Sequence, residues 1–500
     1  MSSPTASTPT YLDKLPDEVL VIIADYVIEA NIPCPFESHD DCIRGLHNAW
    51  PESRYEALTK PYMHYGICFN GSAFSLKQIM DGFLLHPETR LWARVLNFRY
   101  KKSLVHKQNP FKSIKQEFGW MVEACTKLGL KVEGMELPVI SRDGMAKEIC
   151  SGLESDSTWP YKRLEFLAQV LHKVTKFCYY TDADWIWPVP IASTGPASRI
   201  ITTPVPSALR TVEQYCLGQH LAGYVESNTY QTLLPAFFLP NIRVIQCLNI
   251  ISPSDYECLP HLGPDAPRPH TSPVTTLHIT WSLIRRETLE KFLRLPKALV
   301  EYSYRNSADI GNNPCTMRDM GLLLSKYHSK SLEILTLNGT VTNEIRATPR
   351  STVEGHSIAP ERIGSLRHFV KLRVIEAPYW SLVRFSGREI PNLPDYETPS
   401  LLQLLPKSLQ IIKLSVDECQ EEWLTYIKAQ LRCMIQKKRE MYPRLTKVEV
   451  DIRYIAGKER PDWDCLYQSF MDCLADLAMK QKVHFSIRCV DPDDEEWHGM

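Results

Sequence analysis

The sequence predicts an α/β protein, in which a short all-α module at the N-terminus precedes a long repeat solenoid of strands and helices. A three-residue apolar pattern typical of a buried strand recurs along most of the chain, and stretches with helical periodicity separate its copies. The chain has 500 residues, whereas one compact core usually holds about 100–200 residues. Its length therefore favours either several domains or one elongated array.

The recurring pattern places apolar residues at a first position and again three and five positions later. Residues two apart on a strand point to the same face, so the last two positions enter the core, and the first buries the chain where it approaches the strand. The nine copies are Ala93/Leu96/Phe98, Val174/Phe177/Tyr179, Ile242/Ile245/Cys247, Val274/Leu277/Ile279, Leu299/Tyr302/Tyr304, Leu332/Leu335/Leu337, Leu372/Ile375/Ala377, Leu409/Ile412/Leu414 and Leu445/Val448/Val450.

From Ile242 onward the copies begin 25 to 40 residues apart, which is near the length of one strand-plus-helix unit. The two gaps upstream of Ile242 are about twice as long and hold either degenerate repeats or insertions. Neither a strand nor a helix buries its apolar face alone, so such units must stack. An unrelated α/β domain with parallel strands is the alternative. The helices expected between copies span 285–295, 317–327, 399–405 and 421–441.

The segment LPDEVLVIIADYV at 15–27 predicts a helix that is apolar around most of its circumference. Pro16 suits the first helical position, and the acidic residues after it complement the positive end of the helix dipole. Leu15 is a poor helix cap, about 1 kcal/mol worse than Ser or Asp. A helix that is apolar nearly all round must be buried on more than one side. We therefore expect part of this short segment to contact another protein. The alternative is a generic amphipathic helix that caps the repeat array.

These residues resemble the opening of an F-box, whose pattern is roughly Leu-Pro-x-Glu-apolar-apolar-x-x-Ile-x-x-Tyr-apolar. The repeat units and their Leu-x-x-Leu-x-Leu core in turn resemble the leucine-rich repeats of fungal F-box proteins, over roughly residues 80–490. The resemblance implies an N-terminal segment that binds a Skp-type adaptor, and through it the cullin scaffold of a ubiquitin ligase, and a repeat array that binds an unknown target protein. The implied adaptor-binding residues are Leu15, Pro16, Glu18, Val19, Leu20, Ile23, Tyr26 and Val27.

The predicted domain organisation has four parts. Residues 1–10 form a disordered tail, because Ser, Thr and Pro offer nothing to bury. Residues 11–70 form the F-box-like module, and residues 71–490 form the solenoid, with a Pro- and aromatic-rich insertion near 180–207. An acidic tail at 491–500 ends the chain.

Candidate target-binding residues follow from the expected curvature. In a curved array the strands line the concave face, and the residue between the two buried positions of each strand points into it. Trp185 and Trp187 in the insertion are further candidates, because aromatic side chains on loops are typical binding anchors. Each candidate is alternatively an ordinary solvated residue or, for the tryptophans, a side chain that pins the insertion to the solenoid. The strand candidates are Gln246, His278, Thr336, Glu376, Lys413 and Glu449.

The composition and the absence of known motifs exclude several classes of function. A net charge of −1 lacks the basic excess of a nucleic-acid-binding protein, and no window approaches the ~20 apolar residues of a membrane helix. The 15 cysteines are scattered without a Cys-x-x-Cys pair, which favours reduced thiols and a cytoplasmic or nuclear protein. No glycine-rich phosphate loop, nucleophile elbow or zinc-protease motif occurs, so we expect no catalytic site and no cofactor.

One cluster of metal-ligating residue types occurs before residue 50. Cys34, His39, Cys42 and His47 lie within fourteen residues, but their spacing matches no usual zinc site, so we predict no metal. The sequence thus predicts a non-catalytic substrate receptor of a ubiquitin ligase. The alternative is a repeat scaffold that binds a partner without any ligase, its F-box vestigial.

Overall fold

The structure is a computed structural model in which twelve strands are described, and every described pairing between them is parallel. The α/β class predicted from the sequence is therefore confirmed. The implied adaptor-binding residues at 15–27, the two tryptophans Trp185 and Trp187, and both predicted tails lie outside the described residues. The described ranges are 66–91, 93–100, 110–130, 159–171, 173–181, 211–219, 233–248, 269–282, 284–306, 315–338, 362–383, 401–417, 421–453 and 463–490.

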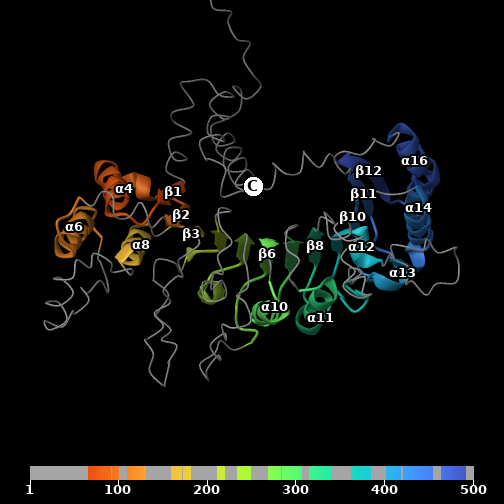
Figure 1. The fold of residues 1–500 in the computed structure, drawn as a ribbon, viewed down its shortest axis with the longest axis horizontal. Coiled ribbons are helices and arrows are strands. Elements are labelled where there is room, and N and C mark those ends of the chain that lie inside the picture. Colours follow the sequence, from red (N-terminus) through yellow and green to blue (C-terminus); the bar gives the residue numbers. More distant parts are fainter. Residues whose placement is uncertain are drawn as a thin grey trace, which may run out of the picture. The chain divides into compact units, whose positions relative to one another are not determined.

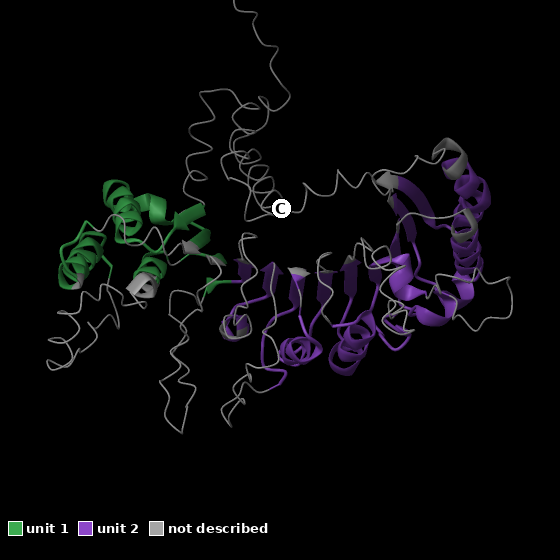
Figure 2. Ribbon diagram, viewed as in Figure 1, with its two compact units in different colours: residues 1–182, 204–212, 496–500 green, residues 183–203, 213–495 purple. Residues whose placement is uncertain are grey.

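The chain divides into two compact units (Figure 2). Unit 1 holds residues 1–182, 204–212 and 496–500, and unit 2 holds residues 183–203 and 213–495. The division falls around the segment near 180–207, where the sequence predicts an insertion. Apolar periodicity alone assigns residues 71–490 to one array, so the separation into two units is visible only in the structure.

Unit 1 has three described strands, and β2 pairs in parallel with each of the other two. Because β2 and β3 are direct neighbours, the long gap after Ala93 is an insertion, and its described residues form two helices and no strand. The strands are β1 (Gly66–Phe69), β2 (Val95–Tyr100) and β3 (Lys176–Thr181), and the helical segments are α4 (Ala73–Leu85), η3 (Pro87–Leu91), α6 (Ile114–Lys127) and α8 (Trp159–Val170) (Figure 1).

An aromatic row runs across the buried side of these three strands. Phe69, Phe98 and Tyr179 are register partners, and all three are almost fully buried. Their ring centroids are 5.5 Å and 5.6 Å apart from one strand to the next. Aromatic pairs at such distances contribute on the order of 0.5–1.5 kcal/mol beyond their area burial. The row therefore stabilises the register of unit 1 from within its core.

A buried ion pair joins the helices of the insertion. The Arg163 Nε and Nη2 atoms on α8 donate to the two carboxylate oxygens of Glu117 on α6, at 2.6 Å and 2.9 Å. Nη1 of the same guanidinium donates to the carbonyl oxygen of Gly71, just before α4, at 3.0 Å. Glu117 and Arg163 are both buried, and burying charges is tolerated only when they are paired in this way. The Arg163 side chain thus links α8 to α6 and to the residue that precedes α4.

Unit 2 has nine described strands, and each pairs in parallel with the next along the chain. The strands are β4 (Gln214–Gln219), β5 (Val244–Leu248), β6 (Thr276–Ser282), β7 (Glu301–Asn306), β8 (Ile334–Asn338), β9 (Val374–Pro378), β10 (Ile411–Asp417), β11 (Lys447–Arg453) and β12 (His484–Val490). The helical segments are η5 (Leu234–Phe238), α10 (Arg286–Leu293), α11 (Met317–His328), α12 (Tyr379–Leu382), α13 (Leu401–Leu404), α14 (Glu421–Gln436), α15 (Lys438–Met441) and α16 (Trp463–Lys480).

One face of the unit 2 sheet packs against helices. Figure 1 shows α10, α11, α14 and α16 along the same face, and their apolar residues, such as Leu289, Leu324 and Leu431, are buried. Every residue of the seven predicted apolar triplets in unit 2, from Ile242 onward, is buried as well. Because side chains alternate along a strand, the residues between these buried positions lie on the opposite side, which we call the open face.

The same backbone hydrogen bonds recur where consecutive strands begin. The amides of Glu333 and Ile334 both donate to the carbonyl of Val300, at 2.7 Å and 3.0 Å, and the amides of Arg373 and Val374 both donate to the carbonyl of Glu333, at 2.9 Å and 3.0 Å. The arrangement is repeated at the starts of β5, β6, β7, β10 and β11. Each strand therefore begins in the same register relative to the preceding strand, so equivalent positions of the repeat lie side by side across the sheet.

The predicted elements largely match the observed ones. The expected helices at 285–295 and 317–327 correspond to α10 and α11, and the expected helix at 421–441 is divided between α14 and α15. The stretch at 399–405 contains only the short α13. Strands β1, β4 and β12 were not predicted from the apolar pattern, and β1 lies within residues 11–70, which were predicted to form an all-α module. Of these, β4 follows the pattern with buried Val212, Tyr215 and Leu217, so the gap before Ile242 does contain a repeat unit.

Candidate binding surface on the open face of unit 2

A single register row contains all six strand residues that the sequence singled out. Each residue of the row pairs with the next across neighbouring strands, and the six predicted side chains are all partly exposed. We call this line the central row. From β4 to β12 it consists of Cys216, Gln246, His278, Ser303, Thr336, Glu376, Lys413, Glu449 and Ser486.

Two further rows flank the central row on the open face, because side chains two residues earlier and later point the same way. The row at the N-terminal ends of the strands is the N-terminal row, and the other is the C-terminal row. The N-terminal row consists of Gln214, Val244, Thr276, Glu301, Ile334, Val374, Ile411, Lys447 and His484. The C-terminal row includes Thr280, Arg305, Pro378, Ser415, Asp451 and Arg488.

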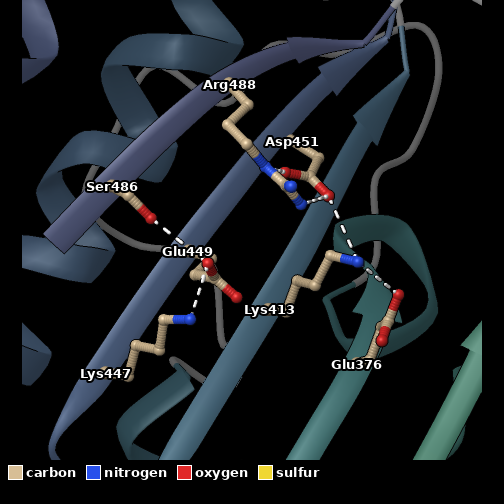
Figure 3. Close-up of polar contacts among 7 residues, drawn as sticks. All are labelled: Glu376, Lys413, Lys447, Glu449, Asp451, Ser486 and Arg488. Carbon is tan, nitrogen blue, oxygen red and sulfur yellow. Dashed lines mark hydrogen bonds and ion pairs between the residues drawn. The ribbon is translucent and has the colours of Figure 1, made fainter. Parts of the chain in front are cut away.

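Strands β9 to β12 carry a ladder of alternating charges (Figure 3). The Lys413 Nζ atom lies 2.7 Å from Glu376 Oε1 on one neighbouring strand and 3.5 Å from Asp451 Oδ2 on the other. Asp451 in turn accepts two hydrogen bonds from Arg488, from Nε at 2.9 Å and from Nη2 at 3.0 Å. Opposite charges therefore bridge four adjacent strands without a break, with the buried Asp451 at the centre.

The ladder shifts the pKa values of its members. Burial lowers the pKa of Lys413, but the carboxylates of Glu376 and Asp451 outweigh this effect, so the pKa is raised. The hydrogen bond to Asp451 is the main cause of a raised pKa at Arg488. Both side chains therefore carry full positive charge at neutral pH. Because each charge has an opposite partner, the ladder is electrically balanced.

A second ion pair lies beside the ladder. The Lys447 Nζ atom is 2.9 Å from Glu449 Oε1, and Ser486 Oγ donates to the same oxygen at 3.4 Å. Burial raises the pKa of Glu449, but the hydrogen bond and charge of Lys447 outweigh it and leave the pKa lowered. Glu449 is therefore ionised at neutral pH, and its charge is shared between two strands (Figure 3).

Strands β4 to β8 present a mostly neutral central row. The Cys216 Sγ atom donates to Gln246 Oε1 at 3.1 Å, and Ser303 and Thr336 continue the row with uncharged groups. His278 Nε2 lies 3.1 Å from Glu301 Oε1 of the N-terminal row. This hydrogen bond from His278 is the main cause of a lowered pKa at Glu301. The central row therefore changes in character between β8 and β9, from mostly neutral polar groups to paired charges.

Sequence reasoning missed part of this surface. Ser303, between the buried Tyr302 and Tyr304, satisfies the rule that selected the other six residues, and Cys216 satisfies it on the unrecognised strand β4. Asp451 and Arg488 were missed for another reason. They lie two residues beyond the central row on their strands, and only the register of β11 and β12 brings them together. Alternation could have placed both on the open face, but not next to each other.

Other kinds of site find no support within the described ranges. No group of three or more His, Cys, Asp or Glu side chains there is arranged to hold a metal ion. None of the helices in the described ranges combines the length and apolarity needed to cross a membrane. The cluster of Cys34, His39, Cys42 and His47 lies outside these ranges.

The fold and surface define the chain as an α/β protein with a regular parallel sheet and a polar open face. No family model matches the chain, and neither a curated protein nor a solved structure is significantly similar to it.

Proposed function

We propose that the chain is the substrate-recognition subunit of a Skp–cullin–F-box type ubiquitin ligase, in the cytoplasm or nucleus, and binds a target protein on the open face of unit 2. The observation that carries the proposal is the central row, in which nine neighbouring strands each contribute one side chain at the same level. An open row of this kind suits contact with an extended protein surface more than enclosure of a small substrate.

The proposed role requires no chemistry from the chain itself. A receptor raises the rate of ubiquitin transfer by holding a target lysine close to the ligase's catalytic partner, at high effective concentration. The segment 15–27 would bind the Skp-type adaptor through the residues that resemble an F-box. The proposal extends to the finer fold, an irregular leucine-rich-repeat-like solenoid, which is supported by the repeated hydrogen bonds at the strand starts.

Capture of a recombinant Skp-type adaptor by the full chain tests the proposal. The double variant Leu15→Ala plus Pro16→Ala should lose capture, because both residues match the F-box opening. Thr8→Ala plus Pro9→Ala is the matched control in the predicted tail and should retain it. If the unmodified chain fails to bind the adaptor, or if the Leu15/Pro16 variant binds equally well, the receptor proposal is wrong.

The second candidate is a repeat scaffold that binds a partner without a ligase. The regular open face favours it as much as it favours a receptor, since the face needs only a partner. Proteins retained by the full chain can be identified by mass spectrometry and compared with those retained by Thr336→Arg, which places a bulky charge in the central row. Loss of a retained protein in that variant, together with no adaptor capture, would establish the scaffold function.

A further inference from the structure

The charges on the open face are balanced in number but not in exposure. The Arg488 side chain is 54% exposed, whereas its partner Asp451 is 4% exposed. The Lys447 side chain is 37% exposed, whereas its partner Glu449 is 18% exposed. In both pairs the carboxylate lies beneath its cation, so the charge nearest to solvent at this end of the face is positive. On β11 and β12, acidic groups approaching from solvent therefore meet cations first, whereas on β9 and β10 Glu376 is 31% exposed and its partner Lys413 is 27% exposed.

The exposed cations keep hydrogen-bond donors for an external acceptor. Arg488 uses Nε and Nη2 to bind Asp451, and no hydrogen bond from its Nη1 is found among the described residues. The Lys447 ammonium carries three N–H donors, and its ion-pair contact in the described part of the chain is with Glu449. The carboxylates thus orient the two cations without using all of their donors (Figure 3).

An apolar strip leads to Lys447 along the N-terminal row. Ile334, Val374 and Ile411 are consecutive register partners on β8, β9 and β10, and Lys447 follows on β11. All three apolar residues are partly exposed. Neighbouring strands lie about 4.8 Å apart, so the strip is about 10 Å long. Most other positions on the open face are polar. The strip can therefore contact an apolar side chain of a ligand, next to the cation of Lys447.

We propose that strands β8 to β12 bind an acidic segment of a partner protein that carries an apolar side chain at one end. The apolar side chain contacts Ile334, Val374 and Ile411, and the carboxylates pair with Lys447 and Arg488. This inference rests on the proposed function and names the chemistry of the target segment. Lys447 and Arg488 are offset by four residues along the strands, which is about 13 Å. In an extended segment this spacing fits acidic residues at positions i and i+4.

The test uses fluorescein-labelled peptide pools of the form Leu-Leu-Asp-x-x-x-Asp, with Ser, Gly or Ala at the positions x, and the full chain. Fluorescence anisotropy should show binding that weakens when salt rises from about 0.05 M to about 0.5 M, because added ions screen exposed charges. Pools with Asn in place of both Asp residues should bind at least about ten-fold more weakly. Pools with Ser in place of both Leu residues should also lose affinity.

Variants of the chain locate the contact. Lys447→Gln and Arg488→Gln should each weaken binding of the acidic pool by about ten-fold, whereas Arg488→Lys should retain part of it. Lys437→Gln, which removes an exposed cation between α14 and α15, is the matched control and should bind as the unmodified chain does. Thermal melting of each variant confirms that it remains folded.

Three outcomes would overturn the inference. Equal binding of the Asp and Asn pools excludes recognition of acidic groups, and unchanged binding by Arg488→Gln excludes this surface. If residues 1–490 bind the acidic pool and the full chain does not, the chain's own acidic stretch at 491–500 is the occupant in place of a partner. Adaptor capture is independent of all three outcomes. If the chain captures the adaptor but binds no acidic peptide, the inference about the target segment is wrong and the proposed receptor function still stands.

Discussion

The two units place their charges in opposite ways. In unit 1 the Glu117–Arg163 pair is sealed among helices, whereas in unit 2 the pairs of Lys413, Lys447 and Arg488 lie on an open sheet face. A buried pair is expensive to break, because the remaining charge has no water to replace its partner. In unit 2 the carboxylate of Asp451 is buried, but Lys447 and Arg488 are 37% and 54% exposed, so these cations remain accessible to a ligand. The Glu117–Arg163 pair therefore stabilises the fold of unit 1, whereas the exposed cations of unit 2 can bind a ligand.

The largest effect should come from breaking the buried pair of unit 1. Arg163→Ala removes both hydrogen bonds from the guanidinium to the buried Glu117 carboxylate and the bond to the Gly71 carbonyl, and should cost about 3–5 kcal/mol. Hydrogen exchange followed by mass spectrometry should show faster exchange of the amides in β1 to β3. Lys127→Ala removes the exposed partner of Glu123 and should leave exchange unchanged. Equal effects of the two variants would contradict the distinction between buried and exposed pairs.

Acidification should destabilise unit 2 through a buried histidine. His328 on α11 donates from Nε2 to the carbonyl of Leu293 at 2.6 Å and accepts at Nδ1 from the amide of Leu299 at 3.4 Å. Burial lowers its pKa to about 4, although the hydrogen bond to Leu293 opposes the shift. The ring is therefore neutral in the folded state, and protonation favours unfolding.

The sign of this effect follows from the lowered pKa. The stability due to neutral His328 is fully present above pH ~6.5, the ordinary pKa of histidine, and is lost as the pH falls toward about 4. The full loss is on the order of 3 kcal/mol. Urea unfolding of the full chain at pH values between 7 and 4 measures it. In His328→Gln, which cannot titrate, this part of the pH dependence should disappear, and its persistence would assign the effect to other groups.

Adding one methyl group should have opposite effects in the two units. Gly321 on α11 packs against the Ile363 backbone so closely that a Cβ atom would clash with the Ile363 carbonyl oxygen, and Gly321→Ala should cost about 1–3 kcal/mol. A Cβ atom at Gly119 on α6 would instead point into open space, so Gly119→Ala should stabilise the helix by about 0.5–1 kcal/mol. Melting temperatures that change in the same direction would refute the close packing of α11.

The smallest effect should come from the charge ladder on the open face. Lys413→Met removes its pairs with Glu376 and Asp451 but leaves Asp451 bound to Arg488. We expect a loss of less than about 1 kcal/mol, because the pair with Glu376 is partly exposed to solvent. Chemical unfolding at low and high salt measures this loss and its screening. A loss as large as that of Arg163→Ala would place the ladder among the charges that hold the fold.

Local patterns in the sequence were sufficient to predict the buried framework of this protein. The apolar triplets, such as Leu332/Leu335/Leu337, predicted strands, and every residue of these triplets is buried, while alternation placed Glu376, Lys413 and Glu449 on the other face. Both inferences depend on local geometry, since the period of two along a strand and the exclusion of apolar side chains from water are properties of a short segment. The α/β class followed from the same patterns.

Which of these segments are neighbours became clear only from the folded chain. The structure showed that β2 pairs directly with β3 across a long insertion, that Glu117 contacts Arg163 46 residues later, and that Asp451 lies beneath Arg488. Ion pairs of this kind need two segments to meet at one register, and no local pattern encodes the pairing of segments far apart in the chain. Which member of a pair faces the solvent is settled by packing, and packing exists only once the whole unit has folded.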